Sequence, residues 1–143
     1  MTRAAEPILL DTNVLVDATN AARPRHARAL SFLGRPHLVI CAQVIREFLV
    51  VATRPPKLNG LGMDLDIAMA NMQQFRRLAP LLAEEKPLLP RLLDLLTTIP
   101  CRGKQVHDAS LVAAMLVHDV PTLATSNPTD FSRFGDLIRI VEL

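Results

Sequence analysis

Short apolar runs that end in polar residues recur at wide intervals along the chain. These strand-length runs lie at residues 8–10, 38–40, 80–82, 122–124 and 138–141. Between them, apolar residues recur three or four positions apart, which is the period of an α-helix with one buried face. The helical patterns cover residues 13–18, 25–33, 42–53, 65–78, 88–98 and 107–118.

Strands that alternate with helices form right-handed crossovers, and these give a parallel sheet covered by helices on both faces. We therefore expect an α/β fold with a parallel sheet of four to five strands, the run at 80–82 being the weakest. The 143 residues fit a single domain over residues 1–143. Half of the residues are hydrophobic and 21% are charged, a composition that excludes an intrinsically disordered chain.

Two segments rich in Pro, Gly and basic residues interrupt the helical patterns, at 54–62 and 100–104. The first holds two Pro and two Gly in nine residues, which rules out regular structure. Each segment is either a solvated connector or part of the rim of a polyanion-binding site.

The formal charge of +2 permits contact with a polyanion without requiring it. The chain has five Phe but no Tyr or Trp, so a bound nucleic acid would be held mainly by its phosphates rather than by stacked bases. Cys41 and Cys101 show no metal-ligand spacing and are predicted to be free thiols. No apolar stretch is long enough to span a membrane and no signal peptide is evident, so we expect a cytoplasmic protein with no membrane contact.

Carboxylates are expected at the carboxyl edge of the sheet, where parallel α/β proteins bind ligands. Asp11 directly follows the first strand, and Asp108 opens a nearly uncharged helix. Glu47 lies beside an apolar helical stripe, where a carboxylate needs a cation, either a metal ion or an Arg. Asn127 and Asp130 follow the fourth strand.

Each of these positions also has a purely structural interpretation. Helix capping explains Asp11, a salt bridge explains Glu47, the helix dipole explains Asp108, and turn formation explains Asn127 and Asp130. We expect His107 to face solvent or to cap its helix, because no second His stands at metal-ligand spacing. The remaining aspartates considered are expected to be solvated; they are Asp17, Asp66, Asp94, Asp119 and Asp136.

Taken together, the acids and the amide at one strand edge favour a metal centre. Hard oxygen ligands without Cys or His suit Mg²⁺ or Mn²⁺, with a substrate phosphate and waters completing the shell. The chemistry that fits is metal-assisted hydrolysis of a phosphodiester. The chain has no nucleophile elbow, Walker loop or dinucleotide-binding glycine motif that would support an esterase, a P-loop NTPase or a dehydrogenase.

Four segments of the chain resemble the four motifs of PIN-domain ribonucleases, in order and in spacing. They are residues 8–17, 44–48, 107–114 and 125–131, which span nearly the whole chain. The single-domain length resembles the VapC-type toxins of bacterial type II toxin–antitoxin systems.

The resemblance implies endonucleolytic cleavage of RNA that depends on Mg²⁺, with Mn²⁺ able to substitute. It also implies a homodimer that a cognate antitoxin protein inhibits. By matching positions, Asp11 and Asp108 would be metal ligands, and Glu47 and Asn127 would complete the catalytic set. Many relatives carry Asp where this chain has Asn127, which leaves open whether Asp130 substitutes for it and whether a second metal binds.

Two other classes of function remain as alternatives. A catalytically silent PIN-like module would bind RNA or a protein without cleaving, although the intact acids argue against it. A receiver-like or phosphatase domain would need a second acidic cluster or a DxDxT motif, which residues 11–13 do not supply.

The helices at 65–78 and 88–98 carry more apolar residues than a peripheral pair needs. They either pack wholly into the core or form a self-dimer contact and an antitoxin groove around Met69, Met72 and Phe75.

Overall fold

The fold is a parallel sheet between two layers of helices, as the alternating pattern predicts. The computed structural model describes residues 5–143. Within them the strands are β1 (Ile8–Leu10), β2 (Leu38–Cys41), β3 (Leu81–Leu82), β4 (Thr122–Thr125) and β5 (Arg139–Glu142). All neighbouring strands pair in parallel, in the order β3-β2-β1-β4-β5. The α/β fold class and the upper strand number expected from the sequence are therefore confirmed.

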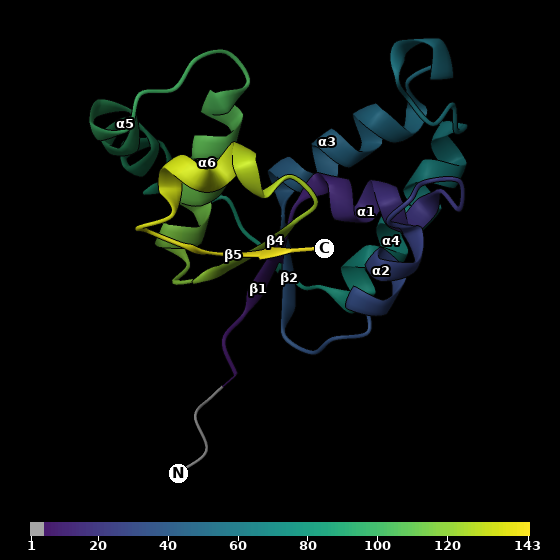
Figure 1. The fold of residues 1–143 in the computed structure, drawn as a ribbon, viewed down its shortest axis with the longest axis horizontal. Helices are drawn as coiled ribbons and strands as arrows, with labels where there is room; N and C mark the ends of the chain where they lie inside the picture. The colour runs from purple at the N-terminus through teal and green to yellow at the C-terminus, as the bar shows by residue number, and fades with distance from the viewer. Residues whose placement is uncertain (1–4) are drawn as a thin grey trace.

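The helices also follow the predicted order. They are α1 (Thr12–Thr19), α2 (His26–Phe32), α3 (Ala42–Thr53), α4 (Leu65–Leu78), α5 (Leu88–Thr98) and α6 (Gln105–Val117). Short 3₁₀ helices cover Pro56–Leu58 and Pro128–Phe134. In Figure 1, α1 to α4 lie on one side of the sheet, and α5 and α6 lie on the other. None of the helices within residues 5–143 is long and apolar enough to cross a membrane.

The strand order places a topological switch point at the centre of the sheet. The chain moves outward from β1 to β2 and β3, then returns to lay β4 against the free side of β1. Ile8 in β1 consequently pairs with Leu38 on one side and with Thr122 on the other. Beyond the carboxyl ends of β1 and β4 the following segments diverge, which opens a crevice for a ligand.

The core forms where α3 and α4 pack on one face of the sheet and α6 packs on the other. Phe48 of α3 is fully buried and meets Phe75 of α4 edge to face, with ring centroids 5.3 Å apart. On the other face α6 buries five of its 13 residues, Ala109, Leu111, Val112, Ala113 and Met115. It begins at Gln105, two residues before the predicted start, so Asp108 lies in its first turn.

The predicted apolar surface on α4 is only partly correct. Met69 is exposed, but Met72 and Phe75 are buried in the core, where Phe75 meets Phe48 of α3. A groove between α2 and α4 lies farther along, with Leu30 and Leu78 half exposed beside it. The expectation of an exposed groove around Met69, Met72 and Phe75 is therefore wrong for Met72 and Phe75, although Phe75 lines the groove between α2 and α4.

Candidate active site

Asp11 connects the end of β1 to the start of α1, and its carboxylate is satisfied by three hydrogen bonds. Oδ1 accepts the backbone N–H of Thr12 at 2.7 Å, so Asp11 is also the N-cap of α1. Oδ2 accepts the hydroxyl of Thr125 at 2.8 Å and the amide of Asn13 at 3.2 Å. Burial raises the pKa of Asp11, the Thr125 and Thr12 hydrogen bonds oppose this rise, and the charges of Glu47 and Asp130 add to it.

The ends of β1 and β4 are held together by polar side chains whose role the sequence reasoning missed. The amide of Asn13 donates to the hydroxyl of Thr125 at 3.2 Å, and its oxygen accepts the N–H of Ser126 at 3.0 Å. Thr125 is the last residue of β4 and is fully buried, which is unusual for a polar side chain. Asn13 lies just after β1 and Thr125 ends the adjacent strand β4, and this position in the sequence could have identified both residues. Both donate hydrogen bonds to Asp11 and so orient its carboxylate.

Glu47 is half-buried on α3 and faces the same crevice, and within residues 5–143 it makes no ion pair with an Arg. Its Oε2 accepts the hydroxyl of Thr12 at 2.8 Å, and its Oε1 accepts the amide of Gln43 at 3.1 Å. The adjacent Arg46 instead pairs with Glu84, at 2.9 Å. The arrangement therefore does not support the salt-bridge interpretation of Glu47.

Asp108 brings a third carboxylate to the crevice from the first turn of α6. Burial raises its pKa to about 6, the charges of Asp130, Asp11 and Glu47 add to the rise, and Lys104 opposes it. The neighbouring His107 is exposed, as expected, and its carbonyl accepts the amide of Gln43 at 2.8 Å. This last bond ties α6 to α3 across the mouth of the crevice.

One open cavity joins all the predicted site residues. Asp11, Glu47, Asp108 and Asn127 line it together, and so does Asp130. Asn127 is exposed and Asp130 is half-buried, so both side chains of the post-β4 segment are accessible. Four basic residues line the same cavity; they are Arg23, Arg46, Arg54 and Lys104.

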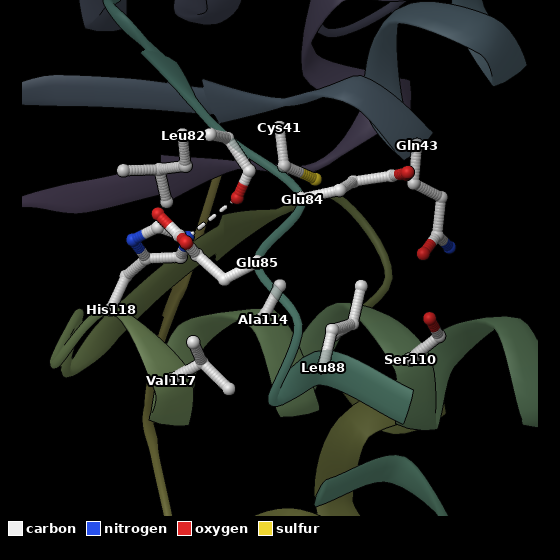
Figure 2. Close-up of a pocket in the computed structure, with 11 residues that line it drawn as sticks. Cys41, Gln43, Leu82, Glu84, Glu85, Leu88, Ser110, Ala114, Val117 and His118 are labelled. Atoms are coloured by element: carbon white, nitrogen blue, oxygen red, sulfur yellow. Dashed lines mark hydrogen bonds between the residues drawn. The ribbon is translucent and has the colours of Figure 1, made fainter. Parts of the chain in front are cut away.

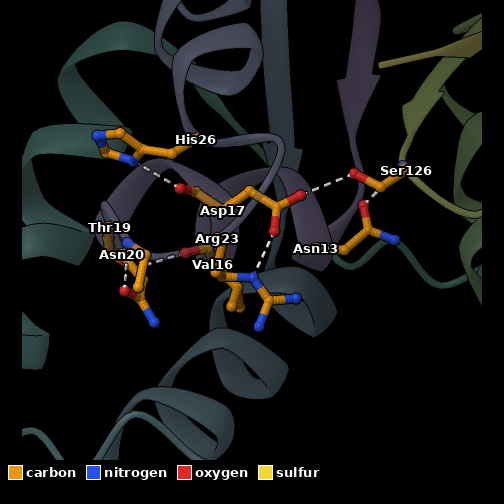
Figure 3. Close-up of polar contacts among 9 residues, drawn as sticks. Asn13, Val16, Asp17, Thr19, Asn20, Arg23, His26 and Ser126 are labelled. Carbon is orange, nitrogen blue, oxygen red and sulfur yellow. Dashed lines mark hydrogen bonds and ion pairs between the residues drawn. The ribbon is translucent and has the colours of Figure 1, made fainter.

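Asp17 is the clearest error of the sequence reasoning, which placed it in solvent. It is buried on α1, where its carboxylate accepts the hydroxyl of Ser126 at 2.9 Å and pairs with Nε of Arg23. Figure 3 shows these contacts, together with the 2.8 Å bond between Nδ1 of His26 and the carbonyl of Asp17. The reason is that α1 is buried nearly all round, so no face of it leaves an acid in water.

A second, smaller cavity is lined by Cys41 (Figure 2), and Gln43 lines both this cavity and the crevice. Both Cys41 and Cys101 are free, as predicted. Burial raises the pKa of the Cys41 thiol, which keeps it protonated and a weak nucleophile. Beside it, His118 is committed to the carbonyl of Ala83 at 2.7 Å. Nucleophilic chemistry is therefore not favoured in this cavity.

The acidic crevice suits a hard divalent cation by its donor chemistry. Within residues 5–143 no three His, Cys, Asp or Glu side chains close around a ready-made metal position. Mg²⁺ does not need one, because it typically takes one or two carboxylates and completes its shell with waters and phosphate oxygens. The raised pKa values of Asp11 and Asp108 reflect burial and mutual repulsion that a cation would relieve. The residues therefore fit Mg²⁺ or Mn²⁺.

Comparison with known proteins gives a consistent result. The family model of the PIN domain matches residues 8–137. The chain is 30% identical over 136 residues to Ribonuclease VapC24 of Mycobacterium tuberculosis, covering 88% of this chain and 90% of that protein. It is 34% identical over 131 residues to Ribonuclease VapC48 of the same species, covering 87% and 89%. The fold is similar to that of VapBC2 from Rickettsia felis, which was solved bound to a promoter DNA fragment. The TM-score is 0.68 and the sequence identity is 15%, and the match covers 95% of this chain and 98% of that one.

Proposed function

The chain belongs to the PIN domain family, and from this membership we propose that it is a metal-dependent endoribonuclease, the toxin of a toxin–antitoxin pair. The two ribonucleases to which it is similar support this activity, since each is covered over most of its length. The observation that carries the proposal is the shared cavity of Asp11, Glu47, Asp108 and Asn127 at the switch point of the sheet. We take residues 1–143 as one PIN domain, of which residues 1–4 lie outside the described part.

In this proposal Asp11 and Asp108 hold Mg²⁺, and Mn²⁺ can replace it. An ion held there would supply positive charge to balance that of the phosphate and would make a water more acidic for hydrolysis of the phosphodiester. Thr125, Asn13 and the backbone of Thr12 orient Asp11, so its carboxylate is fixed before substrate arrives. This preorganisation removes part of the cost of assembling the reacting groups.

Glu47 and Asn127 act on the substrate side of the crevice. Thr12 and Gln43 each donate one hydrogen bond to Glu47, which leaves its oxygens further lone pairs to accept a proton from the attacking water. The exposed amide of Asn127 donates to a phosphate oxygen. Asp130, whose charge acts on both Asp11 and Asp108, stands near enough to assist as a further carboxylate.

The proposed substrate is RNA, held through its phosphates. A chain without Tyr or Trp has few stacking platforms, whereas four basic side chains surround the acidic crevice. We further propose a homodimer and an antitoxin protein as partners, acting in the cytoplasm. Exposed leucines on α5, Leu89 and Leu93, offer apolar surface for such contacts.

Cleavage assays with the purified chain test the proposal. Total RNA is incubated with Mg²⁺, with Mn²⁺ or with EDTA, and the new 5′ ends are mapped by sequencing for the wild type and the Asp11→Asn variant. We expect defined cleavage sites only with metal and only in the wild type. A chain that binds RNA but never cleaves it would be the silent binding module instead.

A further inference from the structure

Arg54 stands at the end of α3, on the rim of the acidic crevice. It follows Glu47 by seven residues, which is two helical turns, so both side chains project from the same side of α3. Both line the crevice. At a rise of 1.5 Å per residue, the backbone positions of Glu47 and Arg54 are about 10 Å apart along the helix axis. Arg54 therefore places a positive charge at some distance from the acidic centre, where Glu47 lies.

The loop after α3 is built around Arg54. The carbonyl of Arg54 accepts the N–H of Gly62 at 2.9 Å, and its Nη2 donates to the carbonyl of Asn59 at 3.2 Å. Gly60 packs so closely that a Cβ there would come within 1.8 Å of the Arg54 carbonyl oxygen. Asn59 and Gly62 both adopt positive φ, as this tight path requires.

Further backbone bonds tie the same loop to the last turn of α3. The N–H of Leu61 donates to Val51 at 2.9 Å, and the N–H of Met63 donates to Ala52 at 2.8 Å. A flexible loop would not have these backbone hydrogen bonds, nor the close approach of Gly60 to the backbone of Arg54. The loop is therefore a support that fixes the base of the Arg54 side chain beside the crevice.

The other basic residues of the crevice already have anionic neighbours. Arg23 pairs with buried Asp17, and Arg46 pairs with Glu84. The positive charge of Lys104 interacts with Asp108 and partly opposes the rise in the pKa of that carboxyl. Within residues 5–143 Arg54 takes part in no ion pair, and its Nε is buried without a hydrogen-bond acceptor. An unpaired guanidinium donor is unfavourable unless a ligand supplies the acceptor.

We propose that Arg54 binds a backbone phosphate of the RNA next to the one that is cleaved, which rests on the ribonuclease function proposed above. An acidic crevice repels a polyanion, so a fixed cation at its rim is needed to hold the strand in register. A guanidinium that turns so that Nε is exposed to a phosphate can bind it with two parallel hydrogen bonds. Arg54 thereby positions the substrate and leaves the bond-breaking step to the acids.

RNA binding without cleavage tests this role. The Asp11→Asn background removes turnover, and a fluorescein-labelled single-stranded RNA of about 12 nucleotides and mixed sequence serves as the probe. Anisotropy titrations from about 50 to about 300 mM KCl give the affinity and its salt dependence. We expect Arg54→Gln to weaken binding about tenfold and to reduce the log–log salt slope by about 0.7, the value for one phosphate contact on a single strand.

Lys57→Gln is the matched control, because Lys57 is an exposed cation in the same loop that does not line the crevice. It should leave the salt slope unchanged, and Arg54→Lys should keep the slope while losing part of the affinity. If Arg54→Gln fails to fold, Arg54→Met keeps the apolar stem packed and carries the same comparison.

Two outcomes would overturn the inference: an unchanged slope in the variants that remove the charge, Arg54→Gln or Arg54→Met, or an equal loss in Lys57→Gln. Failure of the ribonuclease proposal is distinguishable, because it would show as absence of metal-dependent cleavage by the wild type whatever Arg54 does.

Discussion

The hydroxyl of Thr12 donates a 2.8 Å hydrogen bond to Oε2 of Glu47, and so joins the first turn of α1 to α3. Thr12 directly follows Asp11, whose Oδ1 accepts the Thr12 N–H. One residue therefore holds two carboxylates in place through its backbone and its side chain. Two acids that would otherwise repel each other are kept close by neutral donors, which leaves room for a cation between the elements.

Replacing either proposed metal ligand should abolish activity. We expect Asp11→Asn and Asp108→Asn to lower metal-dependent RNA cleavage at least about 100-fold. Each variant replaces a charged carboxylate ligand of the cation by a neutral amide. Gel assays of RNA cleavage in Mn²⁺ measure the effect. Asp136→Asn, at an exposed position, is the control. Comparable cleavage by either ligand variant would contradict the assigned metal site.

Asp108 should make stability depend on pH when no metal is present. Its pKa is raised from 3.8 to about 6, so folding is disfavoured by its ionisation: the penalty is absent below about pH 4 and complete above about pH 6. Because the side chain is partly exposed, solvent screening reduces the expected size to about 1 kcal/mol. In EDTA, Asp108→Asn should therefore melt about 3 °C above the wild type at pH 7 and level with it at pH 4.

Divalent metal should reverse this difference. Thermal melts of both proteins across that pH range, with and without Mn²⁺, provide the measurement. A constant gap between the two proteins at every pH would show that Asp108 does not carry the effect.

Glu47→Gln should separate catalysis from stability. The amide keeps an oxygen that can accept the Thr12 hydroxyl, so the melting temperature should change by less than about 2 °C. Cleavage should fall at least about tenfold, because the proton-accepting charge is lost. Glu84→Gln makes the same chemical change at an exposed acid that does not line the crevice and should leave cleavage intact. A stability loss with normal turnover would assign Glu47 a structural role.

The sequence predicts the layers and the crevice because both depend on regular periodicity. All five strands lie within a residue or two of their predicted positions, including the two-residue β3. The four site residues share one cavity because each was placed at a strand end or on a helix facing that edge. When a helix is buried on nearly all sides, as α1 is, the apolar pattern does not show which of its positions meets a polar group of another element. Asp17, which bonds Ser126 and Arg23, is such a position.

The same limit explains the error on α4. Met72 and Phe75 have the same spacing whether they face a partner or the protein's own core. The position of α3 decides between the two, since Phe48 occupies the surface that Phe75 meets. That packing is tertiary information, which a single helix does not encode.

Asp17 should contribute to stability despite lying outside the crevice. Asp17→Asn removes the charge that pairs with Arg23 and weakens the acceptor of the Ser126 hydroxyl. We expect a loss of about 2 kcal/mol in the free energy of unfolding. Urea denaturation measures it, with Asp94→Asn on the exposed side of α5 as the control. Equal unfolding midpoints for the two variants would contradict a structural role for the Asp17 pair.

The central position of β1 has a consequence for local motion. This three-residue strand is hydrogen-bonded to neighbours on both sides, and the N–H of Asp11 continues the ladder to Ala124 at 3.0 Å. Amides in such a position exchange with solvent only when the domain unfolds as a whole, whereas the rim segments open locally. The carboxylate that anchors the site is thus carried by the last part of the molecule to come apart. A partner that silences this crevice must therefore work from outside, by filling its entrance, because partial unfolding would release the rim long before it disturbed Asp11.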